Sequence, residues 1–271
     1  MFVGWIRKNT FLSDLEEFEK FKVIDKNLIL NTVLENQSLC FGAYEDKKLV
    51  GFITAYSFEK HILINNFSYL DELDEDIQKR LVKILLNNIF EDEKSIMILS
   101  TPEEKSMFSS LGFLEHAKFK KALYSGGSVA FNFSNATAKS INNDGYMPIM
   151  KNLDSRCFND ERMEYITKNI FKSSSLMLST QLGYQHSYAL NKSIIKISPW
   201  VMEDGAFNEA EKLLRGVIYH RGLKKLVAFI PSDVKEITDL YESYNFNLTD
   251  SRYLMYKNTK PNLDLEMMYG F

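Results

Sequence analysis

The architecture of this chain follows from one stretch, VGFITAYSFEKHILI (Val50–Ile64), because LGYQHSYALNKSIIK (Leu182–Lys196) repeats its pattern about 132 residues later. Gly51 falls over Gly183, and aromatic, basic and β-branched positions follow in the same register. Later segments also match in the same order, with slips of one residue. A match through four successive segments indicates one structural unit that is written twice.

Each copy is predicted to contain three antiparallel strands followed by a helix, a strand, a helix and a strand. Clusters of β-branched and aromatic residues indicate the strands, and apolar residues at helical spacing indicate the helices. In the first copy these elements are LCFGAYED, KKLVGFITAYSF, HILINNFSYL, a helix from about Glu75, SIMILS, a helix with Thr101 as cap, Pro102 in its first turn and Gly112 at its end, and HAKFKKALY.

The second copy repeats this order after its own helical stretch, DERMEYITKNIF, just as SDLEEFEKF and LNTVLENQ precede the first. Its elements are LMLSTQLGYQHSYAL, KSIIKISPWVM, a helix near 208–221, KKLVAFIP, a helix near 234–243, and SRYLMYKN. This order predicts an α+β fold rather than a doubly wound sheet. We expect domains at 1–134 and 148–271, joined by a linker at 135–147 that is rich in small and polar residues.

Composition narrows the functional classes. With 271 residues the chain can form two domains that each bury a core. A net charge of −3 gives no overall attraction to nucleic acid or to an anionic membrane. No apolar run has the length of a signal peptide or of a membrane span, so a cytoplasmic protein is expected. Cys40 and Cys157 lie far apart without metal-ligand spacing, so we expect buried thiols and no metal site.

The repeated order resembles the GNAT acyltransferase family over nearly the whole chain. In the first copy the resemblance rests on FGAYEDKKLVGFITAY and on LSTPEEKSMFSSLGF, in which a helix ends at Leu-Gly-Phe. In the second copy it rests on IIKISPWVMEDGAFNEAEKLL, VAFIPSDVKEITDLYESYNF, SRYLMY and the terminal EMMYGF. The tandem arrangement is similar to bacterial proteins that pair an N-terminal GNAT domain with a YitH-like C-terminal one.

The resemblance implies two tandem GNAT-like domains, each a mixed, mainly antiparallel twisted sheet flanked by helices. It also implies transfer of an acetyl group from acetyl-CoA to a small-molecule or peptide amine, with pantetheine beside the third strand. The positions that it implies for donor binding are Phe67, Ser68, Tyr69, Asp76, Ile77, Gln78 and Phe108. It implies Glu59 as a base and Tyr241 as the acid that protonates the leaving thiolate.

The stretch LDELDEDIQKRL (Leu70–Leu81) departs from the family pattern. The R/Q-x-x-G-x-G/A motif of the family would fall on Leu73, Asp76 and Gln78, and none of the three matches. Five acids surround this helix start. They favour the helix dipole, but each would repel a pyrophosphate by about 1 kcal/mol or more at close range. In the second copy only Ala210 suits the motif.

Other side chains could also move a proton. Glu59, His61 and His186 fall near the third strand of a copy and could accept a proton from an amine. Asn65 and Asn66 could supply polar contacts at a bulge in that strand. Phe108 occupies in the first copy the position that Tyr241 has in the second, so neither copy carries a full catalytic set.

Three functions remain open from the sequence. The first is an N-acetyltransferase whose acidic first copy attracts a cationic amine. The second is a non-catalytic tandem GNAT protein that binds or scaffolds a partner. The third is a transferase that uses aminoacyl-tRNA, which the absence of a basic stripe disfavours.

Overall fold

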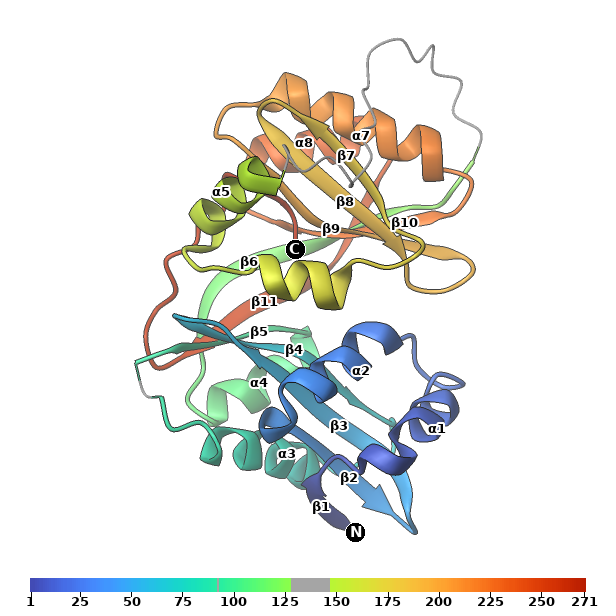
Figure 1. Cartoon of the computed structure of the whole chain (residues 1–271), viewed down its shortest axis with the longest axis vertical. Coiled ribbons are helices and arrows are strands. Elements are labelled where there is room, and N and C mark those ends of the chain that lie inside the picture. Colours follow the sequence, from blue (N-terminus) through green and yellow to red (C-terminus); the bar gives the residue numbers. More distant parts are fainter. Residues whose placement is uncertain (92, 128–146) are drawn as a thin grey trace. The chain divides into compact units, whose positions relative to one another are not determined.

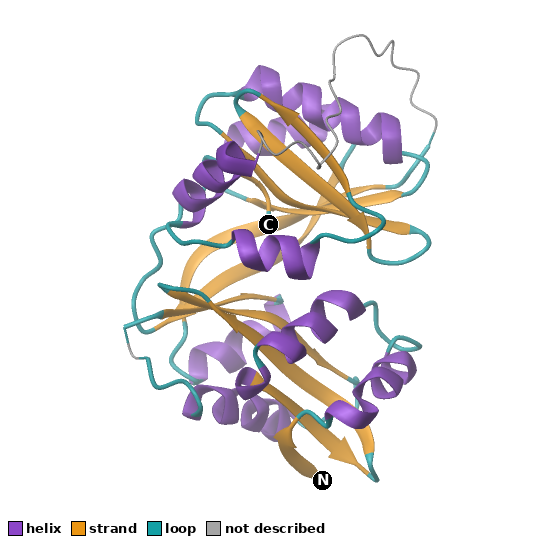
Figure 2. Ribbon diagram, in the orientation of Figure 1, coloured by secondary structure: helices purple, strands orange, loops and turns teal. Residues whose placement is uncertain are grey.

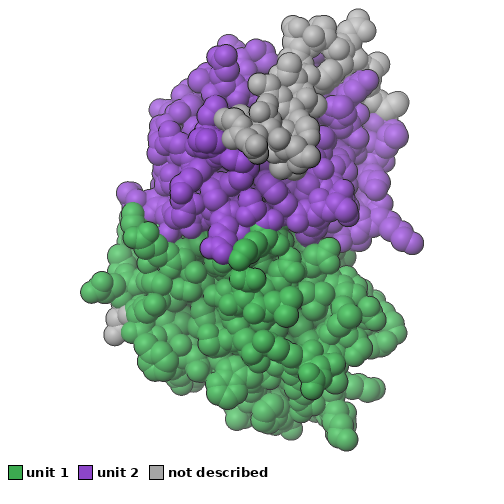
Figure 3. Space-filling model, in the orientation of Figure 1, with its two compact units in different colours: residues 1–116, 168–170, 254–261 green, residues 117–167, 171–253, 262–271 purple. Residues whose placement is uncertain are grey.

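The chain forms two compact units in the computed structural model, which describes residues 1–91, 93–127 and 147–271. The first unit comprises Met1–His116, Lys168–Ile170 and Leu254–Pro261, and the second comprises the remaining described segments (Figure 3). Two strands are therefore divided between the units, β6 (Leu114–Tyr124) and β11 (Asn247–Lys257). The predicted linker, apart from Met147, lies outside the described residues.

The first unit has a sheet in the order β1-β2-β3-β4-β5, followed by the end of β11. In Figure 1, α1 and α2 cover one face of this sheet and α3 and α4 cover the other. Its elements are β1 (Phe2–Trp5), α1 (Lys8–Phe18), α2 (Lys26–Glu35), η1 (Gln37–Leu39), β2 (Cys40–Glu45), β3 (Lys48–Ser57), β4 (His61–Tyr69), α3 (Glu75–Asn87), β5 (Ser95–Ser100) and α4 (Pro102–Ser110).

Local chemistry sets the turns of the first unit. Asp46 and Lys47 both have positive φ and form the two-residue turn between β2 and β3, a type that matches the twist of a hairpin. Thr101 and Glu104 form a capping box at the start of α4. Gly112, with φ of 85°, ends this helix in the left-handed region that glycine tolerates. The sequence predicted the cap and the final glycine, and both predictions are confirmed.

A hydrophobic core of the first unit lies between the sheet and the helices α1 and α2. Phe52 from β3 is fully buried and meets the rings of Phe11 and Phe18 edge-on, with centroids 5.9 and 5.1 Å apart. Such aromatic pairs stabilise a core beyond the area that they bury. At the other end of the unit, the Lys257 Nζ atom donates to the carbonyl of Leu111, so β11 satisfies a carbonyl at the end of α4.

The second unit has a sheet in the order β6-β10-β9-β8-β7, with β12 paired to β9. As Figure 2 shows, helices again flank the strands. Its elements, besides β6 and β11, are α5 (Met147–Phe158), α6 (Met163–Tyr165), β7 (Leu176–Thr180), β8 (Gly183–Ala189), β9 (Ile194–Met202), α7 (Phe207–Arg221), β10 (Lys225–Pro231), α8 (Lys235–Ser243) and β12 (Met268–Gly270). The π-helix η2 (Ile166–Ile170) is divided between the units, because its last three residues, Lys168–Ile170, belong to the first.

Strand pairing confirms the repeat. In each unit a hairpin of antiparallel strands, β3–β4 or β8–β9, is followed by a parallel pairing, β4–β5 or β9–β10. The parallel pairing begins at His61 in the first unit and at Ile194 in the second. The sequence match had set Ile62 over Ile194, so the register in this strand is shifted by one residue. The predicted α+β class, with a mainly antiparallel mixed sheet, is confirmed.

Four elements were not predicted, namely β1, η1, α5 and β12. The two cysteines are buried and free, as expected, and burial raises the pKa of Cys40 to about 12. Among the described residues, no helix is long and apolar enough to cross a membrane. In the same residues, no group of three or more His, Cys, Asp or Glu side chains is arranged to hold a metal ion.

Candidate functional site

A β-bulge in β4 marks the candidate site of the first unit. Thr54 pairs with Asn66 and Ala55 pairs with Ile64, so Asn65 is one extra residue on β4. Pairing between β4 and β5 ends at the same point, with Ile64 opposite Ile98. From Asn66 to Tyr69, β4 is paired to β3, but its other edge has no strand partner within the described residues. This edge presents main-chain donors and acceptors.

Hydrogen bonds fix the side chain of Asn65 at the bulge. The Thr54 hydroxyl donates to Asn65 Oδ1 at 2.7 Å, and Asn65 Nδ2 donates to the Thr32 hydroxyl at 2.8 Å. Thr32 in turn donates to the carbonyl of Leu28 in α2. The bulge is therefore tied to the helix that covers this face, and the prediction of polar contacts from Asn65 at a strand bulge is confirmed.

Asn66 offers a free hydrogen-bond donor beside the bulge. Its Oδ1 accepts from the Ser68 hydroxyl at 3.0 Å, whereas its Nδ2 is buried and has no partner among the described residues. A buried donor without a partner costs about 1–3 kcal/mol, so this atom suits the carbonyl oxygen of a ligand. The sequence suggested polar contacts here but could not show which atom is left unpaired.

The predicted donor-binding residues Phe67, Tyr69 and Phe108 lie together in the first unit. The Phe67 ring centroid is 5.1 Å from that of Tyr69 and 5.6 Å from that of Phe108, which is fully buried in α4. Burial and then the charge of Glu104 raise the pKa of Tyr69, and a hydrogen bond to Glu104 raises it further. Tyr69 therefore stays a neutral phenol. Sequence reasoning missed Glu104, because the sequence indicates its capping position in α4 but not its hydrogen bond with Tyr69 of β4.

The start of α3 is already occupied by an anion from the chain itself. Asp74 is the N-cap, and its carboxylate accepts from the amide of Asp76 at 2.7 Å. The amides of Ile77 and Gln78 both donate to the carbonyl of Asp74 at 3.1 Å. Gln78 Nε2 donates to the carbonyl of Leu73. These groups do not fit the diphosphate of acetyl-CoA, because the amides of Asp76, Ile77 and Gln78 that would bind it already have acceptors.

In the second unit the corresponding strand edge is covered. The β9 bulge lies opposite His186, and the pairing of β9 with β10 ends at Lys196 opposite Val227. Beyond that point β12 pairs with β9, with Met268 opposite Val201 and Gly270 opposite Trp200. The amide of Phe271 donates to the carbonyl of Phe229 in β10 at 2.9 Å. The C-terminal strand therefore bonds to both strands where their own pairing stops.

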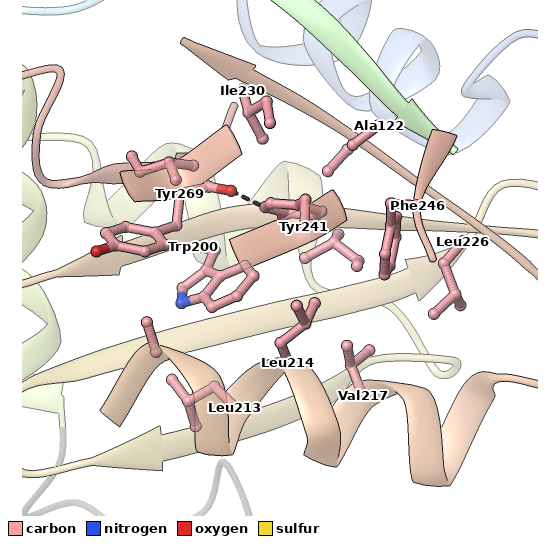
Figure 4. Packing of buried hydrophobic residues seen from close by; sticks show 14 of the residues in the cluster. Ala122, Trp200, Leu213, Leu214, Val217, Leu226, Ile230, Tyr241, Phe246 and Tyr269 are labelled. Atoms are coloured by element: carbon pink, nitrogen blue, oxygen red, sulfur yellow. Dashed lines mark hydrogen bonds between the residues drawn. The ribbon is translucent and has the colours of Figure 1, made fainter. Parts of the chain in front are cut away.

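Tyr241, the predicted acid, is engaged with this C-terminal strand. Its hydroxyl donates to the carbonyl of Tyr269 at 2.8 Å (Figure 4). Both side chains are fully buried. The Tyr241 ring also lies 5.7 Å from that of Trp200 and 4.9 Å from that of Phe246, centroid to centroid. Burial raises the pKa of Tyr241 well above its ordinary value. This geometry favours a structural role for Tyr241.

Glu59, the predicted base, lies at the other end of β4. It is exposed in the turn between β3 and β4, where Ser57 pairs with Ile62. Strand geometry puts His61 about 13 Å from Asn65 along β4, so Glu59 is roughly that far or farther from the bulge. His61 is buried in the first pair with β5, opposite Ser95. Neither side chain belongs to the polar group at the bulge.

His186, the other candidate base, is a buried part of the second unit. Its Nδ1 lies 2.7 Å from the carbonyl of Ser198 and its Nε2 lies 2.7 Å from the Ser175 hydroxyl. Burial, and to a smaller extent the positive charges of Lys172 and Arg221, lowers its pKa to about 4. His186 therefore stays neutral in the folded chain.

Because the pKa of His186 is lowered in the folded chain, we expect the free energy of unfolding to fall in acid. The unfolded chain binds the proton below pH 6.5, whereas the folded chain does not until about pH 4. The stabilisation is thus present above pH 6.5 and is lost as the pH falls towards 4, by about 3 kcal/mol in all. Urea unfolding at several pH values should show this difference between the wild type and His186→Gln. Equal pH dependence in both proteins would contradict the assignment.

Comparison with known proteins shows the fold. No family model and no curated protein matches the sequence. A candidate acetyltransferase of Pyrococcus horikoshii matches 100% of this chain and 93% of its own length, with a TM-score of 0.80 and 15% identity. A GCN5-related N-acetyltransferase of Sphaerobacter thermophilus matches 98% of each chain, with a TM-score of 0.63 and 10% identity.

A third structure repeats the tandem arrangement. It is a tandem GNAT protein from the clavulanic acid biosynthesis pathway, matched over 94% of this chain and 97% of its own, with a TM-score of 0.63 and 8% identity. All three matches extend over both units. The chain therefore has the fold of GNAT acetyltransferases, and the fold predicted from the sequence is confirmed.

Proposed function

We propose that the first unit is an N-acyltransferase site that takes an acetyl group from a pantetheine thioester such as acetyl-CoA and gives it to an amine. The observation that carries the proposal is the bulged edge of β4, where pairing with β5 ends and Asn66 Nδ2 is buried with no partner in the part of the chain that the structure describes. A strand edge can bond the amides of a pantetheine arm, and the Asn66 donor can meet a carbonyl oxygen.

The reaction needs little from the protein. The nitrogen of the amine attacks the thioester carbonyl carbon, the carbon–sulfur bond breaks, and the proton lost by the amine goes to the leaving thiolate. A donor such as Asn66 Nδ2 stabilises the oxygen on which charge develops. Phe108 has no hydroxyl with which to protonate the thiolate, and Tyr241 is engaged within its own unit. Glu59 and Tyr241 remain sequence predictions that this proposal does not use.

The second unit is proposed to be a YitH-like copy that takes no donor. Its C-terminal residues cover the edge of β9 that corresponds to the free edge of β4. The sequence repeat supports copies at 1–134 and 148–271, although β6 and β11 are divided between the compact units. The acids around the start of α3 support a cationic amine as the acceptor.

Changing Asn66 to alanine is expected to weaken the binding of acetyl-CoA about tenfold, the effect of one lost hydrogen bond of roughly 1.4 kcal/mol. Calorimetry on the full chain measures this directly. The matched control is Asn88→Ala, since Asn88 Nδ2 donates to the carbonyl of Ile84 at the far end of α3. Equal effects of both variants would remove Asn66 from the site.

A non-catalytic tandem GNAT protein is the second candidate, because the chain caps α3 with its own carboxylate and covers β9 with its own terminus. The same titration separates the two candidates. Saturable binding of acetyl-CoA or S-acetylpantetheine supports a transferase. If neither ligand binds at millimolar concentration, the chain binds or scaffolds some other partner.

A further inference from the structure

Two helix starts in the first unit are closed to phosphate by the chain's own side chains. At α3 the Asp74 carboxylate accepts from the amide of Asp76. At α4 the carboxylate of Glu104 accepts from the amide of Thr101 at 2.9 Å, and the Thr101 hydroxyl accepts from the amide of Glu104. Amides at a helix start are the usual binding groups for phosphate, and these are already bonded.

Negative charge also gathers where β4 ends. The charges of Glu104, Glu103 and Asp71 all raise the pKa of Tyr69, the last residue of β4. Two lysines in this region are already ion-paired, Lys22 with Asp71 and Lys79 with Glu75. A ligand phosphate here would meet repulsion from these carboxylates.

The edge of β4 has the opposite character. Asn66, Phe67 and Ser68 carry no charge, and the edge of their strand that has no strand partner among the described residues can bond to amides. The Asn66 Nδ2 atom adds a buried donor that lacks a partner among the described residues. A pantetheine arm has two amides and no charge, so it matches this edge, whereas the nucleotide end of coenzyme A does not match the helix starts.

We propose that the first unit recognises its donor through the pantetheine arm alone, so that S-acyl pantetheines bind equally well with or without a nucleotide. This inference rests on the proposed acyltransferase function and names its donor class. It also explains why the glycine-containing phosphate pattern is missing at Leu73, Asp76 and Gln78, since a site that does not bind diphosphate does not need it.

Calorimetry on the full chain tests the proposal with three probes: acetyl-CoA, S-acetylpantetheine, and 3′,5′-adenosine diphosphate as the nucleotide alone. We expect the dissociation constants of the two thioesters to agree within about threefold, and the nucleotide not to displace S-acetylpantetheine. Acetyl-CoA that binds ten times more tightly than S-acetylpantetheine would overturn the inference but not the proposed function. Failure of both thioesters to bind would overturn both.

The variant Asp74→Ser tests whether the Asp74 carboxylate excludes the phosphates of the nucleotide, because serine still caps a helix but carries no charge. It should tighten the binding of acetyl-CoA about fivefold and change the binding of S-acetylpantetheine less than twofold. Glu45→Gln removes one carboxylate from the exposed end of β2 and is expected to change neither. If Asp74→Ser affects both thioesters alike, Asp74 does not exclude the nucleotide and the inference fails.

Discussion

A chain that lacks Met267–Phe271 is expected to lose about 6 kcal/mol from the free energy of unfolding of its second unit. Met267, Met268 and Tyr269 are at most 1% exposed, and burying a side chain of this kind stabilises a fold by about 2 kcal/mol. A whole domain is stable by only about 5–15 kcal/mol, so we expect the second unit to unfold or to persist only marginally. Urea unfolding, followed by the fluorescence of buried Trp200, measures the loss.

The control for this deletion is the removal of Phe271 alone. That change keeps the three buried side chains and removes one hydrogen bond, from the Phe271 amide to Phe229, together with ring contacts to Phe119 and Phe158. We expect it to cost about 1–2 kcal/mol. If the longer deletion costs no more than this, β12 is not part of the core, and the second unit could expose a free β9 edge to a donor.

Turns and helix ends that depend on neighbouring residues are the features that the sequence predicts well. The β2–β3 turn, the Thr101 cap and the end of α4 at Gly112 depend on residues within a few positions of each other. Their physical causes, positive φ and side-chain capping, can be inferred from residues that are neighbours in the sequence. Elements of this kind were predicted to within a few residues.

Elements that depend on distant partners were missed. β12 has only three residues, and its strand state comes from pairing with β9 rather than from its own composition. In α5, the buried positions Met150, Leu153 and Cys157 follow helical spacing, but no helix was predicted for this segment. In both cases tertiary contacts determined the structure, and a single sequence does not display them.

The candidate site was predicted in part for the same reason. Asn65 and Asn66 were suggested as polar contacts at a bulge in the third strand, and the bulge lies there. Among the described residues Asn66 Nδ2 lacks a partner, and this depends on the strand register and on the position of Ser68, which the sequence does not determine. The sequence indicated that the acids near α3 would repel phosphate. It did not show the hydrogen bond from the Asp76 amide to the Asp74 carboxylate.

Replacing Asp154 with alanine is expected to destabilise the second unit by about 3–5 kcal/mol. Asp154 is fully buried and accepts two hydrogen bonds from Arg162, at 2.8 and 3.0 Å, and one from the Tyr184 hydroxyl at 2.6 Å. The guanidinium also lies 3.1 Å from the centroid of the Phe158 ring. Without the carboxylate, Arg162 would keep a buried charge with no counterion, which is the costly way to break such a pair.

The double variant Asp154→Leu/Arg162→Met separates the cost of an uncompensated charge from the value of the pair. Two apolar side chains of similar size leave no buried charge, so we expect most of the lost stability to return. Equilibrium unfolding of the wild type, Asp154→Ala, Arg162→Met and the double variant gives the coupling energy. A double variant as unstable as Asp154→Ala would mean that the ion pair between Asp154 in α5 and Arg162 at the start of α6 itself stabilises the second unit, rather than merely avoiding an isolated charge.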